Sequence, residues 1–374
     1  MADRYWVGGT GSWNSTAKWS TTSGGASGAS VPTATDNAIF DANSATSNAY
    51  VVTIQASQTC ADLTYTPFAG DGATQFSIIG TFVIAGTFST SGTQGNRRAW
   101  FSSSTFGLMR DMQIATIGTV SDVDFRDIRV TGAGGTLTGT RIGDLKGNVG
   151  ITFSTSKNCF RIGTGNWSDD QWSATSGGSV STDNFPLAQD TAVFDENTSA
   201  ATTQAFTSTI PYAGSVDMSA RTSSVNLNIL TTLNIYGDWK FGSGINMTGG
   251  SSITFSGRNT QVITSAGKTF PCSIIVNSYG GTVELADALN TSTSSITVTN
   301  GTFITNGYNV TAFALSSSNS NVREIKLGAS TVTLGNDVTF TTSTNLTFDA
   351  GTSSIVQTAN GPNFNGGGQT FYDV

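Results

Sequence analysis

The run 122–129, which reads Asp-Val-Asp-Phe-Arg-Asp-Ile-Arg, is the densest group of ionisable side chains in the chain. Alternate residues of an extended strand face the same side, so Asp122, Asp124 and Arg126 are expected to point outward together. Two carboxyl groups on one face can supply the acid and the base that cleave a glycosidic bond. The favoured interpretation is a solvated ladder of Asp and Arg, which adds little stability. A catalytic role for Asp122, Asp124 or Asp127 is the alternative.

Tryptophan is the second residue type with an obvious binding chemistry. Four of the seven tryptophans lie in segments rich in Gly, Ser and Thr, namely Trp13, Trp19, Trp167 and Trp172. Exposed indole faces stack on sugar rings as flat apolar platforms, which makes these four the candidate glycan-binding residues. The favoured interpretation is that they are core plugs of a repeated module, because both pairs recur together with a Pro and a Phe-Asp pair.

The ionisable composition excludes several classes of chemistry. The chain has no histidine, 17 Lys and Arg, and 24 Asp and Glu, which gives a formal net charge of −7 and a pI near 4.5. A Ser-His-Asp triad, a Cys-His dyad and a histidine metal ligand are therefore excluded. An acidic chain with few and scattered cations does not favour a nucleic-acid partner. We predict that the protein is not an enzyme and needs no cofactor.

The cysteines and the Asp-x-Asn sequences are expected to be structural. Cys60, Cys159 and Cys272 are odd in number and widely spaced, so we predict buried free thiols. The sequences Asp41–Asn43 and Asp195–Asn197 hold oxygen ligands for Ca²⁺, but they lack the dense carboxylates of a calcium loop. We therefore predict Asx turns at both places and no metal site.

The apolar residues are too scattered for a membrane segment. No apolar run reaches the ~18 residues that a membrane helix needs. The N-terminal residues Met1–Trp6 hold no apolar stretch of the kind found in signal peptides. We expect no membrane insertion and no secretion through such a signal. Assembly inside a host cell and release by lysis fit this expectation together with the polar composition.

Short alternating runs of apolar and polar residues predict an all-β protein. Apolar residues alternate with polar ones over 233–241 and 296–299, which is the period of a half-buried strand. Asn300-Gly301 and Asn306-Gly307 separate such runs and are predicted to form turns. No stretch of 11–18 residues has apolar positions at helical spacing with a capping signal.

An internal repeat is the most informative feature of the sequence. Gly9–Trp13 recurs as Gly163–Trp167, and Asp36–Asn43 recurs as Asp190–Asn197, both with an offset of 154 residues. So many identities in register do not arise by chance. The chain therefore contains two copies of one module, which start near residues 1 and 155.

The repeats and the alternation together predict the organisation of the chain. We expect a first β-rich module with a Trp- and Gly-rich cap at 1–154, a second copy at 155–250, and β-solenoid coils at 251–374. Lys268–Phe270 recurs as Gln369–Phe371, so the coils are expected to continue beyond the end of this chain. Short strands, close turns and outward Thr, Asn and Ser favour a right-handed parallel β-helix. Tandem β-sandwiches are the alternative.

The cap residues resemble a known pattern. Trp6–Trp13, followed by Trp19, Pro32 and Phe40-Asp41, resembles the opening of autotransporter-associated β-strand repeat passengers. It resembles more closely a module in fibre-like virion proteins of tailed bacteriophages, whose solenoid coils are similar to residues 299–311. The phage resemblance is preferred, because an autotransporter needs a signal peptide and a membrane barrel.

This resemblance implies a function in the virion. It implies a non-enzymatic structural component, either a tail fibre or spike or a head fibre or decoration, assembled in the host cytoplasm and then extracellular. The implied partners are other virion proteins and further copies of the chain, with a trimer favoured. Host attachment would bring contact with surface polysaccharide. A glycan-binding adhesin module and a polysaccharide-cleaving tailspike are the alternative functions.

Overall fold

The protein is described by a computed structural model that covers residues 1–46, 49–70, 72–93, 97–199, 204–206, 212–291 and 293–374. It is 45% strand and 2% helix, and its strands wind into a parallel β-solenoid of about 13 turns. The predicted all-β, β-helical fold is confirmed. The alternative of tandem β-sandwiches is wrong, because the strand pairs of the described residues are parallel in all but two cases. The chain divides into two compact units between Thr155 and Ser156.

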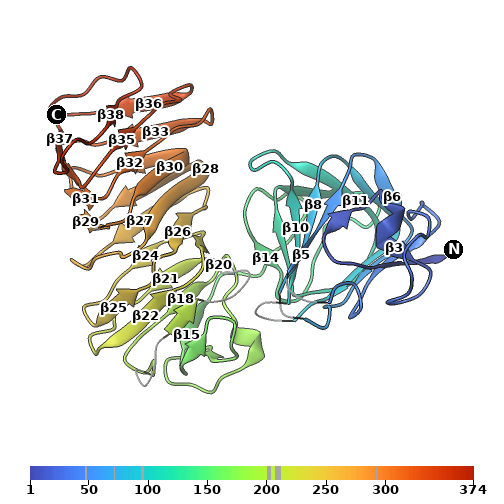
Figure 1. Ribbon diagram of the computed structural model, residues 1–374. Coiled ribbons are helices and arrows are strands. Elements are labelled where there is room, and N and C mark those ends of the chain that lie inside the picture. The colour runs from blue at the N-terminus through green and yellow to red at the C-terminus, as the bar shows by residue number, and fades with distance from the viewer. Residues whose placement is uncertain (47–48, 71, 94–96, 200–203, 207–211, 292) are drawn as a thin grey trace. The chain divides into compact units, whose positions relative to one another are not determined.

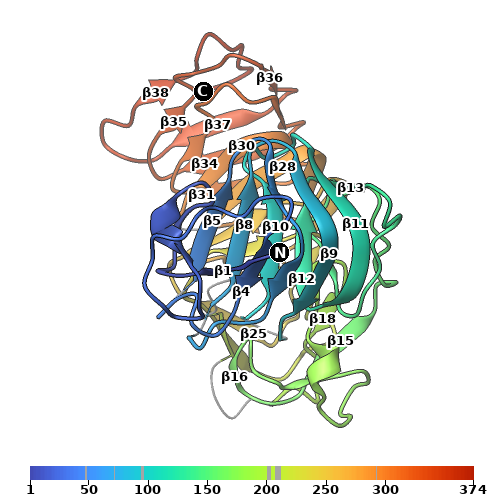
Figure 2. The same ribbon diagram turned by 90° about the vertical axis from the view of Figure 1, so that its right-hand side faces the viewer.

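The first unit contains two sheets and a short 3-10 helix, η1 (Thr16–Lys18). The eight-stranded sheet consists of β1 (Asp3–Trp6), β3 (Trp19–Ser20), β4 (Asn37–Phe40), β6 (Gln58–Cys60), β7 (Leu63–Tyr65), β9 (Phe82–Ser91), β11 (Arg110–Ser121) and β13 (Ile128–Thr131). The six-stranded sheet consists of β2 (Gly11–Ser12), β5 (Tyr50–Ile54), β8 (Thr74–Ile78), β10 (Ala99–Ser103), β12 (Val123–Arg126) and β14 (Gly143–Asp144). Figure 2 shows β5, β8 and β10 side by side.

The core of the first unit contains a column of like side chains. Phe76, Phe101 and Phe125 are register partners in the successive parallel strands β8, β10 and β12. Their rings stack with centroids 4.4 and 5.8 Å apart, and all three are fully buried. Parallel strands lie about 4.8 Å apart, which is close to the stacking distance of aromatic rings. Each of these three coils therefore adds one ring to the column.

The second unit contains one large sheet, two small sheets and the 3-10 helix η2 (Thr182–Asn184). The large sheet consists of β15 (Asn158–Arg161), β17 (Trp172–Ser173), β18 (Thr191–Val193), β20 (Tyr212–Ala213), β21 (Ser215–Asp217), β23 (Leu233–Ile235), β24 (Trp239–Lys240), β26 (Ser252–Phe255), β27 (Thr260–Thr264), β28 (Ser273–Leu285), β30 (Ile296–Ile304), β32 (Leu315–Ser316), β33 (Arg323–Lys326), β35 (Val338–Thr339), β36 (Leu346–Asp349) and β38 (Phe364–Asn365). The small sheets consist of β16 (Gly165–Asn166), β19 (Gln204–Phe206), β22 (Val225–Ile229) and β25 (Ile245–Thr248), and of β29 (Leu289–Asn290), β31 (Val310–Ala312), β34 (Thr331–Leu334) and β37 (Ser354–Gln357).

The coils of the second unit share one uninterrupted core. Figure 1 shows their strands stacked in chain order from β15 to β38. Ile253, Ile274 and Ile296 are register partners in β26, β28 and β30, and all three are fully buried. The hydrophobic cluster to which they belong runs from Cys159 to Ile355. The second copy of the module and the coils after it are therefore held together by the same core.

Each unit begins with the same capping arrangement. Strand β3 pairs antiparallel with β1, and β17 pairs antiparallel with β15, so each covers the first edge of its sheet. The register places Trp6 opposite Trp19 and Arg161 opposite Trp172. The rings of Trp6 and Trp19 meet edge to face at 5.1 Å, whereas the Arg161 guanidinium lies 5.2 Å from the Trp172 ring. A cation–π contact thus replaces an aromatic pair in the second copy.

Glycine is required where successive coils approach closely at a corner. Asn300-Gly301 lies inside strand β30 and does not form the predicted turn between strands. Gly301 has a φ of +79°, and a Cβ atom there would overlap the carbonyl oxygen of Ser278 in the preceding coil. Asn306-Gly307 is a turn as predicted, with positive φ at both residues.

We expect Gly301→Ala to destabilise the second unit by about 1–3 kcal/mol, because the residue needs a positive φ and has no room for a methyl group. The matched control is Gly250→Ala, whose Cβ meets nothing within 4 Å. Urea unfolding monitored by circular dichroism measures both changes. Equal unfolding midpoints for the two variants would contradict the close approach at this corner.

Candidate functional site

The four tryptophans proposed to bind glycans lie in the core. Trp13, Trp19 and Trp172 are fully buried, and Trp167 is 3% exposed. The Trp19 indole N–H donates to the carbonyl oxygen of Trp13 at 2.7 Å, and Trp172 donates to Trp167 in the same way at 3.1 Å. The rings of each pair meet edge to face. The favoured interpretation that they are core plugs is therefore confirmed and glycan stacking is wrong, because the four side chains are at most 3% exposed.

The carboxylates of segment 122–129 are also buried. Asp122 and Asp124 are fully buried, although both were expected to point into solvent. The guanidinium of Arg98, itself fully buried, contacts Asp122 at 3.0 Å and Asp124 at 2.7 Å. Arg141 contacts the second oxygen of Asp122 at 2.7 Å. The expected exposed ladder is wrong here, because arginines from neighbouring coils cover the carboxylates.

This ion network ties coils together and does not support catalysis. Arg98 precedes β10, Asp122 and Asp124 belong to the next coil, and Arg141 belongs to the coil after it. Arg98 also donates to the carbonyl oxygen of Arg141 at 2.7 Å. Asp127 is 1% exposed and accepts a hydrogen bond from the amide of Gly107 at 3.0 Å. A general acid or base must reach its substrate, which these buried carboxylates do not.

The thiols and the Asp-x-Asn sequences have the predicted structural roles. Cys60, Cys159 and Cys272 are free and buried. Asp41 Oδ1 accepts from the amide of Asn43 at 2.9 Å, and Asp195 and Asn197 repeat this Asx turn at 2.9 Å. Within the described part of the chain, no group of three or more Asp, Glu, Cys or His side chains is placed to hold a metal ion.

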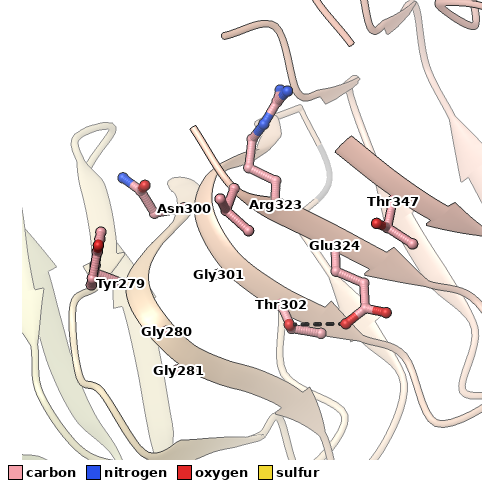
Figure 3. A pocket seen from close by; sticks show the side chains of 10 residues that line it. Tyr279, Gly280, Gly281, Asn300, Gly301, Thr302, Arg323, Glu324 and Thr347 are labelled. Carbon is pink, nitrogen blue, oxygen red and sulfur yellow. Dashed lines mark hydrogen bonds between the residues drawn. The ribbon is translucent and has the colours of Figure 1, made fainter. Parts of the chain in front are cut away.

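The second unit carries a groove of about 430 Å³ at the corner that contains Gly301. We call it the corner groove. Its lining residues come from strands β28, β30, β33 and β36 and from the residues next to them, namely Tyr279, Gly280, Gly281, Asn300, Gly301, Thr302, Val322, Arg323, Glu324 and Thr347. Its volume falls within the range of small-molecule sites. Figure 3 shows Tyr279 on one side of the glycine-lined strands and the Thr302–Glu324 pair on the other.

An irregularity of the coil stack creates the corner groove. The registers of β28 and β30 shift between Asn277 and Thr282, where β28 carries extra residues that include Tyr279 and two glycines. The side-chain amide of Asn300 donates to the side-chain oxygen of Asn277 at 2.6 Å and links the two strands beside the register shift. The Tyr279 side chain is therefore pushed outward, and the residue is 46% exposed.

The carboxylate of the corner groove is already paired, and its buried arginine is bonded to backbone carbonyls. The Glu324 carboxylate accepts from the Thr302 hydroxyl at 3.2 Å and contacts the Lys326 ammonium at 3.0 Å. Arg323 is 1% exposed and donates to backbone carbonyls, including that of Thr344 at 2.7 Å. Burial lowers the pKa of Arg323. The groove thus presents hydrogen-bonding groups, one aromatic ring and a paired carboxylate, while the charge of Arg323 is buried.

Sequence reasoning missed this groove. The available signal was Tyr279-Gly280-Gly281, which interrupts an alternating strand and is followed one coil later by Asn300-Gly301. Because glycine pairs are frequent in this chain, the register shift that exposes Tyr279 is visible only once the coils are stacked.

Comparisons with known proteins leave the function open. Searches against protein-family models, curated proteins and solved structures found no match to this chain. Among the described residues, no helix is long and apolar enough to cross a membrane. The phage resemblance of the cap motif therefore remains an interpretation of the sequence.

We expect Asp124→Ala to destabilise the first unit by about 3–5 kcal/mol, because it leaves the buried Arg98 guanidinium without one of its carboxylates. The matched control is Asp111→Ala, which breaks the Arg129–Asp111 pair, where the Arg129 side chain is 51% exposed. That variant is expected to unfold at nearly the wild-type urea concentration. A small effect of Asp124→Ala would contradict a structural role for the network.

The three thiols are expected to be inert in the folded protein. Burial raises the pKa of Cys159 and Cys272 to about 12 and raises that of Cys60 as well, so the reactive thiolate is scarce at pH 8. A disulfide reagent such as dithionitrobenzoate should label no thiol in buffer and all three in guanidinium chloride. Rapid labelling of the folded protein would show that at least one thiol is accessible.

Proposed function

We propose that the protein is a non-enzymatic structural component of a tailed-bacteriophage virion, in a fibre or spike of the tail or a fibre or decoration of the head. The observation that carries the proposal is the pair of capped, parallel solenoid units, in which backbone ladders and a continuous core run along the coils. Such a stack can be extended coil by coil without changing its core, which suits an elongated scaffold.

The burial of several arginine side chains supports a structural role. Of the 17 Lys and Arg in the chain, Arg98, Arg161, Arg221 and Arg323 are among the largest fully buried side chains. Arg221 donates to the carbonyl oxygens of Asp195 and Thr198 in the neighbouring coil. Buried arginines of this kind hold corners together and are poor candidates for acid–base chemistry.

The proposal includes partners and location. We propose that the chain assembles with other virion proteins and with further copies of itself, and that a trimer is the favoured state. The motif resemblance and the stackable fold support this assignment. We propose that the protein resides in the virion after assembly in the host cytoplasm.

The alternatives differ in how much support they have. A glycan-binding adhesin is favoured by one specific feature, the corner groove with its exposed Tyr279. A polysaccharide-cleaving role for Asp122, Asp124 or Asp127 is not proposed, because all three carboxylates are buried and paired.

The proposal predicts that the protein is found in virus particles. An antiserum against the purified chain should label particles of the tailed phage whose genome encodes it, in immunogold electron microscopy. Mass spectrometry of density-purified particles should detect the chain, and light scattering of the purified protein should give three times 38.7 kDa. A protein that stays in the lysate and is missing from the particles would refute the structural assignment.

A further inference from the structure

The corner groove combines an exposed aromatic ring with a row of hydrogen-bonding side chains. We propose that it binds a neutral oligosaccharide, with Tyr279 as the stacking platform and with Thr302, Glu324 and Asn300 contacting the sugar hydroxyls. This inference extends the proposed structural role by adding a ligand. Its experiment can fail while the assignment to the virion stands.

Tyr279 has the properties of a sugar-stacking residue. It is 46% exposed, in contrast to the buried tryptophans. The guanidinium of Arg258 lies 5.3 Å from the centre of its ring, and this cation–π contact fixes the orientation of the ring. A ring that is already oriented loses little conformational entropy when a ligand packs against it. Apolar C–H faces of pyranose rings are suitable partners for such a platform.

The opposite side of the groove presents hydrogen-bonding groups at the spacing of the coils. Thr302, Glu324 and Thr347 are register partners in β30, β33 and β36, so neighbouring side chains stand about 4.8 Å apart. The Glu324 carboxylate is oriented by Thr302 and Lys326 and keeps acceptor capacity, because a carboxylate has about four lone-pair sites. A hydroxyl-rich ligand supplies the matching donors.

The paired and buried charges of the groove favour a neutral ligand. Lys326 compensates Glu324, and Arg258 is engaged by the ring of Tyr279. Arg323 lines the groove, but its guanidinium is buried and donates to the carbonyls of Ser317 and Thr344. Phosphate and sulfate groups need exposed cationic donors, so a nucleotide or an acidic glycan fits poorly.

The dimensions of the groove suit a short stretch of a polysaccharide. It crosses four successive coils, from β28 to β36, over roughly 14 Å at the usual strand spacing. Gly280, Gly281 and Gly301 line it, and at Gly280 a Cβ atom would stand in open space, so the missing side chain lets a ligand approach the backbone there. An open groove of this kind accepts a chain that continues in both directions.

The test is binding of the whole chain to short neutral oligomers of glucose, galactose, mannose and N-acetylglucosamine, with heparin as the acidic comparator. Saturation-transfer NMR and affinity electrophoresis measure the binding. We expect at least one neutral oligomer to bind and heparin not to bind. Tyr279→Ala should weaken binding about tenfold through loss of the stacking surface, and Glu324→Gln should weaken it about tenfold through loss of a charged acceptor.

Two further variants keep the result interpretable. Tyr279→Phe retains the ring and should bind within about twofold of the wild type. Tyr308→Ala removes a tyrosine that is similarly exposed, at 42%, but does not line the groove, and it should bind as the wild type does. The proposal is overturned if no neutral oligomer binds, if heparin alone binds, or if Tyr279→Ala and Tyr308→Ala bind equally well.

Discussion

Hydrogen bonds between successive coils impose a spacing of about 4.8 Å, and the other features of the protein are built on that spacing. It brings each side chain next to its register partner in the neighbouring coil. Rings such as Phe76 and Phe101 stack at 4.4 Å, and Ile253 and Ile274 follow one another in the core of the second unit. The constraint favours repeated residue types over the varied packing of a globular core.

The corners of the coils carry an energetic cost. The chain must turn several times in each coil, and a turn leaves carbonyl groups without partners in the strand ladders. Buried arginines satisfy these groups, since one guanidinium has five donors: Arg323 bonds carbonyls of Ser317 and Thr344, and Arg221 those of Asp195 and Thr198. Arg98 does the same for a pair of carboxylates. Several of the few charged side chains of this protein are therefore buried and cannot contact a ligand.

A binding site in such a stack must come from a break in its regularity. The register shift between Asn277 and Thr282 is a break of this kind, and it exposes the side chain of Tyr279 beside a glycine-lined floor. The scaffold therefore forms where the register of the strands is regular, and the candidate site forms where that register is interrupted.

The sequence by itself determined the all-β class, the alternating core positions, the two copies of the cap and the Asx turns, because each can be recognised from short stretches of residues. Only the tertiary structure decided which polar residues are buried. Asp124 sits at an outward position of its strand, yet Arg98, 26 residues earlier, covers it. Trp13, which follows Gly11-Ser12, and Tyr279, which precedes Gly280, are both aromatic residues near glycines. Contacts between coils buried the first and left the second exposed. Burial depends on which coil packs against which, and the local sequence around a residue does not show that packing.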